Sequence, residues 1–355
     1  MGMEKIICGI QQLGIGIPDA PKAFAWYRRA FGCDIKILDS EGTAERMLPY
    51  TGGKPQDRRA ILAVNLRGGG GFEIWQPQGR ALRYLQEPVQ LGDLGIVAGK
   101  IKCLDIKVAL AHMQGLDGVK LLTGVVQNPT GARHFFMTDP YDNLFQIEED
   151  DYVFVDTPAA TGGVNGAMIG VSDMERSMIF YGKLLGYDHV LYDITDTFAD
   201  LTNLPGGARR LRRVMLLPSK PMRGPLSEIM GPSHLELVQV MEGPVKKIYA
   251  DRWWGDPGFI HLCFDVRHME AVRRDAEAIG CPFVCDSGVD FQMGEADGHF
   301  TYVEDPDGTL IEFVETFRIP IVRKLGIYLN LKNKDPHKPL PRYITKALRF
   351  LRVKE

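Results

Sequence analysis

The feature of this sequence that most constrains its fold is a repeat at two levels. Residues 138–144 align with residues 304–310 at an offset of 166, and Asp19 aligns with Asp173 at an offset of 154. Within each half, a run ending in Asp, a helical stretch and further strands occur twice. Such regularity indicates that one small unit was duplicated twice, so aligned positions in the four copies can be compared for reactive side chains.

Each unit is predicted to form a strand, a helix and about three further strands, the order βαβββ. In the first unit a strand over 11–19 ends at Pro18-Asp19, and apolar residues recur at helical spacing over 21–32. The other three units are predicted to open with strands at 98–105, 166–173 and 261–266. The four glycines at 68–71 form a hairpin turn rather than a phosphate loop, because no helix with Lys-Ser or Lys-Thr follows. Residues 152–163 are predicted to be a linker.

Length and composition are those of a globular protein with more than one core. The chain has 355 residues, of which 45% are hydrophobic and 25% charged, which favours two domains. No apolar run approaches the ~20 residues of a membrane span, and the first ten residues lack a signal-peptide pattern. The six cysteines are scattered, which is typical of reduced thiols in a cytoplasmic protein.

Charge is distributed unevenly along the chain. Residues 318–355 contain eleven Lys or Arg and two acids, a net charge of +9, which leaves −12 on the remainder. The acidic body argues against nucleic acid as a partner. In the tail, Pro341 is placed to start a helix with apolar residues at helical spacing and basic residues between them. We expect this helix to dock on the acidic body or across a homodimer, with an anionic membrane surface as the alternative.

Several segments resemble the vicinal oxygen chelate superfamily. They are the first strand at 12–19, the helix around Phe180-Tyr181 and the segment at 305–312, and the resemblance extends nearly to Phe317. This superfamily includes glyoxalase I, methylmalonyl-CoA epimerase, extradiol ring-cleaving dioxygenases and bleomycin-resistance proteins. The resemblance implies an α+β fold in which four βαβββ modules pair into two incomplete barrels. We expect an N-terminal glyoxalase-like domain at 1–151 with a degenerate site, a C-terminal one at 164–317 and a basic extension at 318–355.

The resemblance also implies where a divalent metal binds, because ligands in this superfamily come from the first and last strands of each unit. With consecutive units paired, the C-terminal barrel offers Gly166, Glu236, His261 and Glu312, and the N-terminal barrel offers Gln12, Glu73, Ala98 and Gln146. One imidazole with two carboxylates binds such metals better than one carboxylate with two amides. We therefore predict Glu236, His261 and Glu312 as the metal ligands, within roughly 5 Å of one another. Gln12, Glu73 and Gln146 are expected to point inward without holding a metal.

Other residues near these positions are candidates for catalysis and substrate binding. His234 lies two residues before Glu236, so strand alternation places both on one face, and His234 is a fourth ligand or a proton carrier. Together with Glu236 and Glu312 it forms the candidate catalytic set. The resemblance suggests substrate contacts near His299, and Trp253 and Tyr302 are further candidates. His299 is equally consistent with an exposed turn after Asp297-Gly298, and Trp253 with packing between the paired units.

Three functions fit this pattern. The first is a metal-dependent lyase or isomerase of the glyoxalase kind, which moves a proton next to a carbonyl of a small oxygen-chelating substrate. The second is an extradiol-type dioxygenase, which favours two His and one carboxylate around iron. The third is a protein that binds a small molecule without converting it. The metal is Zn, Ni, Mn or Fe in the first two cases, and the sequence does not choose among them.

Overall fold

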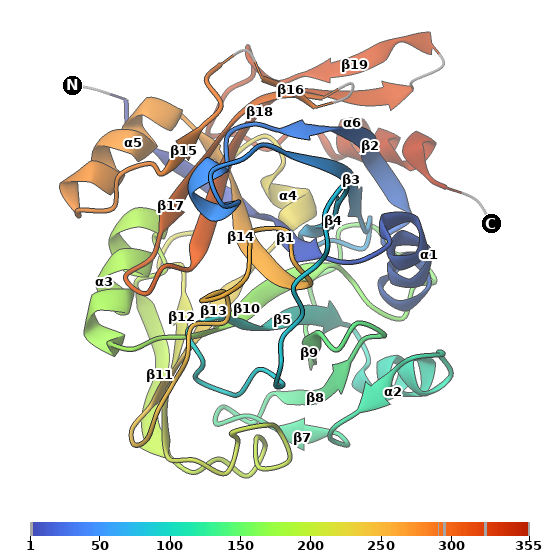
Figure 1. Ribbon diagram of the computed structural model, residues 1–355. Helices are drawn as coiled ribbons and strands as arrows, with labels where there is room; N and C mark the ends of the chain where they lie inside the picture. Colours follow the sequence, from blue (N-terminus) through green and yellow to red (C-terminus); the bar gives the residue numbers. More distant parts are fainter. Residues whose placement is uncertain (1–2, 290, 294–295, 323–324, 354–355) are drawn as a thin grey trace.

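The computed structural model describes residues 3–353 except 290, 294–295 and 323–324, and it is built from four βαβββ-like units that form two curled sheets (Figure 1). The α+β class predicted from the repeat is confirmed. In Figure 1 the blue first unit and the orange-red fourth unit lie together in the upper half, and the green to yellow second and third units lie below them. The sheets therefore do not pair unit one with unit two and unit three with unit four.

The first unit shows how local sequence sets the element boundaries. The side chain of Asp19 accepts a hydrogen bond from the backbone N–H of Lys22 and so caps the helix, Pro21 lies in its first turn, and Gly32 ends it in the left-handed conformation (φ 60°). Its elements are β1 (Ile6–Gly16), α1 (Ala20–Phe31), β2 (Ile35–Ala44), the 3₁₀ helix η1 (Leu48–Tyr50), β3 (Gln56–Val64) and β4 (Gly71–Pro77).

The remaining units repeat this order with additional short elements. The second contains β5 (Gly95–Cys103), α2 (Ile106–Gln114), β6 (Lys120–Leu121), β7 (Val126–Gln127), β8 (Arg133–Thr138) and β9 (Leu144–Glu149). The third contains β10 (Val164–Gly170), α3 (Met174–Leu185), β11 (His189–Asp196), β12 (Leu211–Leu217), α4 (Ser227–Met230) and β13 (His234–Val240). The fourth contains β14 (Gly258–Arg267), α5 (Met269–Ala278), β15 (Cys285–Asp286), β16 (Phe291–Met293), β17 (Ala296–Glu304) and β18 (Leu310–Val322).

The pairing of the units differs from the expectation of domains at 1–151 and 164–317. One sheet has the strand order β15-β17-β18-β14-β1-β4-β3-β2, which joins units four and one, and the other has β11-β12-β13-β10-β5-β9-β8-β6, which joins units three and two. In the first sheet β1 is antiparallel to β14, with Gly14 opposite His261. In every unit the opening strand pairs on one side with the last strand of its own unit, and its other edge pairs with the opening strand of another unit. The sequence of a unit therefore does not specify which other unit completes its sheet.

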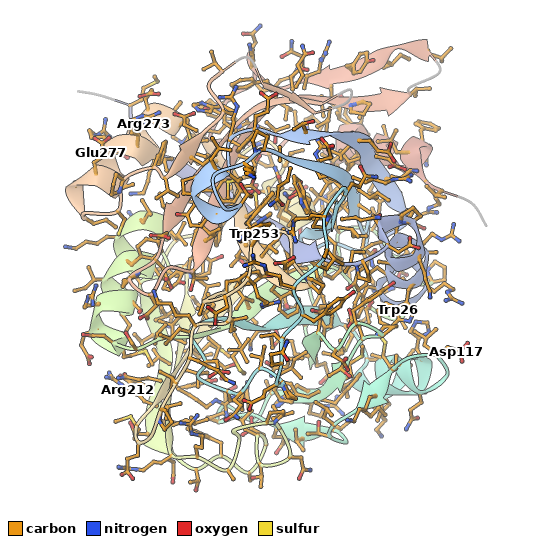
Figure 2. All side chains as sticks on the ribbon, in the orientation of Figure 1. Trp26, Asp117, Arg212, Trp253, Arg273 and Glu277 are labelled. Carbon is orange, nitrogen blue, oxygen red and sulfur yellow. The ribbon has the colours of Figure 1, made fainter. Side chains whose placement is uncertain are left out.

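One continuous core joins the four units. The main cluster of buried residues contains side chains from α1, α2, α3 and α5 and from both sheets. Trp26 of α1 donates a hydrogen bond from Nε1 to the backbone oxygen of Asp117, just after α2, at 2.9 Å, and Figure 2 shows these two residues side by side. All six cysteines are free thiols, as predicted. Within the described part of the chain, no helix is both long and apolar enough to cross a membrane.

The basic tail docks on the body of the same chain. It forms β19 (Ile327–Asn330), α6 (Arg342–Lys346) and the 3₁₀ helix η3 (Ala347–Leu351). Arg342 pairs with Glu228 of α4 at 2.8 Å, and Arg352 pairs with Asp34 at 2.9 Å. Leu348 is buried in a second apolar cluster together with side chains of β2, α4 and β18. Docking on the body of the same chain is the first of the alternatives expected for the tail. Residues 323–324 and 354–355 of the tail lie outside the described residues.

Candidate metal centre

Four side chains converge at the middle of the first sheet, one from each of its four central strands. Glu73 comes from β4, Gln12 from β1, His261 from β14 and Glu312 from β18. His261 Nε2 lies 3.3 Å from Glu73 Oε2 and 3.2 Å from Glu312 Oε2. The Gln12 amide donates a hydrogen bond from Nε2 to Glu312 Oε2 at 3.2 Å. One potential ligand atom from each of Glu73, His261 and Glu312 lies within 4.8 Å of the others, the separation that a shared ion requires.

The polar atoms of this cluster fit a bound cation because they converge on one point of the protein interior. Gln12 Oε1, Glu73 Oε2 and His261 Nε2 are buried and lack a well-aligned hydrogen bond, although His261 Nε2 lies within ion-pair distance of Glu73 Oε2 and Glu312 Oε2. A buried acceptor without a well-formed hydrogen bond costs roughly 1–3 kcal/mol, which a shared ligand would relieve. A divalent cation would satisfy all three at once, and two carboxylates with one imidazole are a suitable set of donors.

The electrostatics of the cluster agree with this interpretation. Burial opposes protonation of His261, but the charges of Glu312 and Glu73 outweigh it and raise the pKa of His261 to about 9. Burial and the charge of Glu312 raise the pKa of Glu73. Burial has the same tendency at Glu312, but the charge of His261 overcomes it and lowers the pKa of Glu312. Positive charge is therefore favoured at this point of the protein interior, whether it comes from a proton or from a metal.

Neighbouring residues fix the orientation of His261. Gly14 lies directly opposite, and a Cβ atom at this position would come within 2.4 Å of His261 Nε2. The ring of Trp254 stacks on the imidazole with centroids 6.3 Å apart and planes inclined by 17°. The hydroxyl of Tyr302 lies 3.5 Å from His261 Nδ1. The imidazole is thus confined on both sides, with Nε2 turned toward the two carboxylates.

The equivalent positions in the second sheet do not form such a cluster. They are Gly166 on β10, Glu236 on β13, Ala98 on β5 and Gln146 on β9. Only Glu236 is ionisable, and it pairs with Lys100 Nζ at 2.8 Å and with Arg213 Nη2 at 2.6 Å. Burial opposes ionisation of Glu236, but the charges of Arg213 and Lys100 outweigh burial and lower its pKa. Two internal cations therefore neutralise this position, and no group of metal-ligating residues was found there among those described.

The predicted ligand set requires a correction. His261 and Glu312 do lie together, but the third residue of the cluster is Glu73 rather than Glu236, which belongs to the other sheet. Gln12 and Glu73, which were assigned to a degenerate site, are part of the cluster. His234 lies 2.9 Å from Glu148 in the second sheet and does not reach the cluster. The positions predicted on the first strand of unit four and on the last strands of units one and four do converge, but units one and four form this sheet rather than units three and four.

A sequence signal for the correct pairing existed. Combining units one and four gives one amide, one imidazole and two carboxylates, whereas units two and three give Ala98, Gln146, Gly166 and Glu236. Only the first combination places a potential ligand at all four positions of one barrel. The other barrel then has a single carboxylate among its four candidate ligand positions. Comparing all three ways of pairing four units would therefore have identified Gln12 and Glu73 as partners of His261.

The candidate substrate residues lie in different places. His299 lines the cavity that opens from Gln12, Glu73 and Glu312. Tyr302 contacts His261 and does not line that cavity. Trp253, labelled near the centre of Figure 2, lines a separate cavity and stacks under the guanidinium of Arg83 at 4.0 Å. Of these three residues, only His299 is positioned beside the cluster to meet a ligand.

Comparison with known proteins adds the family. Residues 163–313 match the model of the Glyoxalase/Bleomycin resistance protein/Dioxygenase superfamily. Glyoxalase I from Zea mays has a TM-score of 0.51 at 15% identity, covering 88% of this chain and 92% of that one. A putative dioxygenase from Bacillus subtilis has a TM-score of 0.55 at 11% identity, covering 87% and 86%. A comparison with curated protein sequences finds no match.

The structural similarities, at such low identity, show a shared fold of paired βαβββ modules. Together with the family match over residues 163–313, which span the third and fourth units, they support the resemblance to the vicinal oxygen chelate superfamily. Members of this superfamily typically bind a divalent metal.

Proposed function

We propose that this protein is a metal-dependent lyase or isomerase of the glyoxalase kind, which moves a proton next to a carbonyl of a small oxygen-chelating substrate. The observation that carries the proposal is the convergence of the buried polar atoms of Gln12, Glu73, His261 and Glu312. These four residues would hold the metal. When bound there, a divalent ion supplies Lewis acidity that stabilises negative charge developing on a carbonyl oxygen.

The protein's own groups account for the proton transfer. Glu73 and Glu312 line the cavity, so either carboxylate is within reach of a ligand. Glu312 Oε2 already accepts a hydrogen bond from Gln12, whereas Glu73 Oε2 accepts none. Glu73 is therefore the proposed base: its carboxylate takes the proton from the carbon beside the carbonyl and returns it to the neighbouring carbon. The overall change is an isomerisation in which nothing is oxidised or reduced by an external reagent.

The two alternative functions receive less support. Dioxygen activation at iron favours two imidazoles and one carboxylate, and His261 is the only imidazole in this cluster among the described residues. Binding without conversion agrees with the concave, largely apolar cavity. It does not account for the convergence of two carboxylates and an imidazole beside that cavity.

Metal stoichiometry tests the ligand assignment. Purified protein equilibrated with Zn²⁺ and then desalted is expected to retain one equivalent per chain, and Glu73→Gln and His261→Ala are each expected to lose it. Gln146→Leu changes the equivalent position of the second sheet and serves as the matched control, with metal content unchanged. Retention of the metal in both Glu73→Gln and His261→Ala would contradict the assignment.

A reaction assay tests the chemistry. The hemithioacetal of phenylglyoxal with 2-mercaptoethanol is expected to rearrange to the α-hydroxy thioester, and proton NMR in D₂O follows both the rearrangement and solvent exchange at the moved position. Glu73→Gln is expected to reduce the rate by more than the ~10²-fold typical of a lost general base, because it removes a metal ligand together with the base, whereas Gln146→Leu should leave the rate unchanged. Consumption of dioxygen with a catechol, and no rearrangement, would instead identify a ring-cleaving enzyme.

A further inference from the structure

We propose that the substrate of this centre has an uncharged, apolar body attached to its oxygen-bearing end, and that the cavity discriminates against anionic bodies. The inference rests on the proposed function for the oxygen-bearing end, while the apolar body follows from the cavity itself. The cavity has a volume of about 130 Å³ and is partly open to solvent. A hydrocarbon body can therefore extend from the chelating group along the cavity toward its open mouth.

Apolar side chains from several elements form most of the cavity surface. They come from β2, β3, α4, β17, β18 and η3, and include Leu38, Leu62, Ile229, Phe300, Ile319 and Leu348. Gln12, Glu73 and Glu312 line the same cavity, and their ligand atoms lie close together. A molecule that fills this space would thus place its oxygen atoms beside these ligand atoms and bury hydrocarbon along the rest.

The other polar groups of the cavity are already engaged by the protein. Gln11 donates to Asp265 and Thr316 through Nε2 at 3.3 and 3.1 Å. His299 Nε2 lies 2.7 Å from Asp286 Oδ1. Asp297 forms an ion pair with Arg318 at 2.8 Å. These groups gain little by contacting a ligand, so the cavity offers few new hydrogen bonds away from Gln12, Glu73 and Glu312.

Charge also selects against an anionic body. The ionisable groups that line the cavity within the described part of the chain are Glu73, Glu312, Asp297 and His299, with no Lys or Arg. A carboxylate on the ligand would be removed from water without a cationic partner, in the neighbourhood of two or three other carboxylates. An alkyl body instead gains from burial, by about fourfold in affinity for each methylene that leaves water.

The basic tail contributes to this selectivity in an unexpected way. Leu348 of η3 lines the cavity, although η3 belongs to the most cationic segment of the sequence. Two cations of this segment pair elsewhere, Arg342 with Glu228 and Arg352 with Asp34, and Arg349 lies over the ring of Phe350. Among the described residues, no Lys or Arg of the tail lines the cavity. The tail therefore closes the cavity with an aliphatic side chain and presents no charge to it.

Three hydroxamic acids with the same chelating group test the proposal. Binding of butanohydroxamic acid, octanohydroxamic acid and suberic acid monohydroxamate to the Zn²⁺-loaded protein would be measured by isothermal titration calorimetry. We expect the octanoyl compound to bind at least tenfold more tightly than the butanoyl compound, and the terminal carboxylate of the suberic compound to abolish that gain. Equal or tighter binding of the suberic compound would overturn the proposal.

A second measurement separates this inference from the proposed function. Displacement of Nile red from the metal-free protein would be compared for 1-decanol and decanoate. Displacement by decanol at concentrations at least tenfold lower supports the apolar cavity even if no metal is retained. Equal potency contradicts it even if the centre binds Zn²⁺.

A charge introduced into the cavity should reverse the preference. Leu348→Lys is expected to make the suberic compound bind more tightly than the octanoyl compound, whereas the control Leu348→Met leaves the order unchanged. Ile229→Lys, on α4, makes the same test from another element and serves if Leu348→Lys does not fold. Unchanged order in a folded Lys variant would show that the body of the ligand lies outside this cavity.

Discussion

At the scale of single residues, the cluster depends on a residue that carries no functional group. Gly14 leaves space for the imidazole of His261, because a Cβ atom there would lie 2.3–2.6 Å from three ring atoms. We expect Gly14→Ala to displace His261, lower Zn²⁺ affinity at least tenfold and cost about 1–3 kcal/mol of stability through overpacking. Zn²⁺ titration and urea unfolding measure both effects. Gly42→Ala, where the nearest atom is 3.8 Å away, is the control that should change neither.

In the second sheet, Lys100 neutralises the buried carboxylates. Its ammonium group is fully buried between Glu236 at 2.8 Å and Glu148 at 3.4 Å. Lys100→Met should cost roughly 3–5 kcal/mol in urea unfolding, because it removes a partner from buried carboxylates. The double variant Lys100→Met/Glu236→Gln should regain part of that loss. Metal content should stay at one equivalent in every folded variant, and a second bound equivalent would show that Lys100 blocks a functional metal site.

At the scale of elements, the sequence predicted the units but not their arrangement. The helix expected over 21–32 and the opening strands of the four units follow from local patterns, and the structure has them at Ala20–Phe31 and at β1, β5, β10 and β14. The pairing of β1 with β14 depends instead on contacts between segments about 250 residues apart. No local pattern of propensity or hydrophobic periodicity encodes such a contact, so Glu236 was assigned to the wrong neighbours.

The last strand of the second unit provides a pH test at this scale. Glu148 of β9 is buried, but the charges of His234 and Lys100 outweigh burial and lower its pKa from 4.5 to about 2. A carboxyl group whose pKa is lower in the folded state stabilises the protein above pH 4.5, and this stabilisation is lost as the pH falls toward 2. The urea midpoint of Glu148→Gln should therefore change less steeply between pH 4.5 and 2 than that of the unmodified protein. Equal slopes would contradict the assignment.

At the scale of the whole molecule, the exchange of units between the two halves makes the metal centre a joint product of both. Gln12 and Glu73 come from the first half, and His261 and Glu312 come from the second, so each half alone supplies two of the four ligands. The second sheet is divided in the same way, with β5 and β9 from the first half and β10 and β13 from the second. Neither half can therefore complete a sheet by itself.

This division predicts the behaviour of the separated halves. Residues 1–151 and 164–355 produced individually should each fail to retain Zn²⁺, because two ligands do not hold a metal through desalting. Produced together, they should associate through the β1–β14 and β5–β10 contacts, copurify and bind one equivalent, which Glu73→Gln in the first fragment should abolish. Zn²⁺ retention by the second fragment alone, lost on Glu236→Gln, would instead mean that consecutive units form the barrels and that the metal centre lies between β13, β14 and β18.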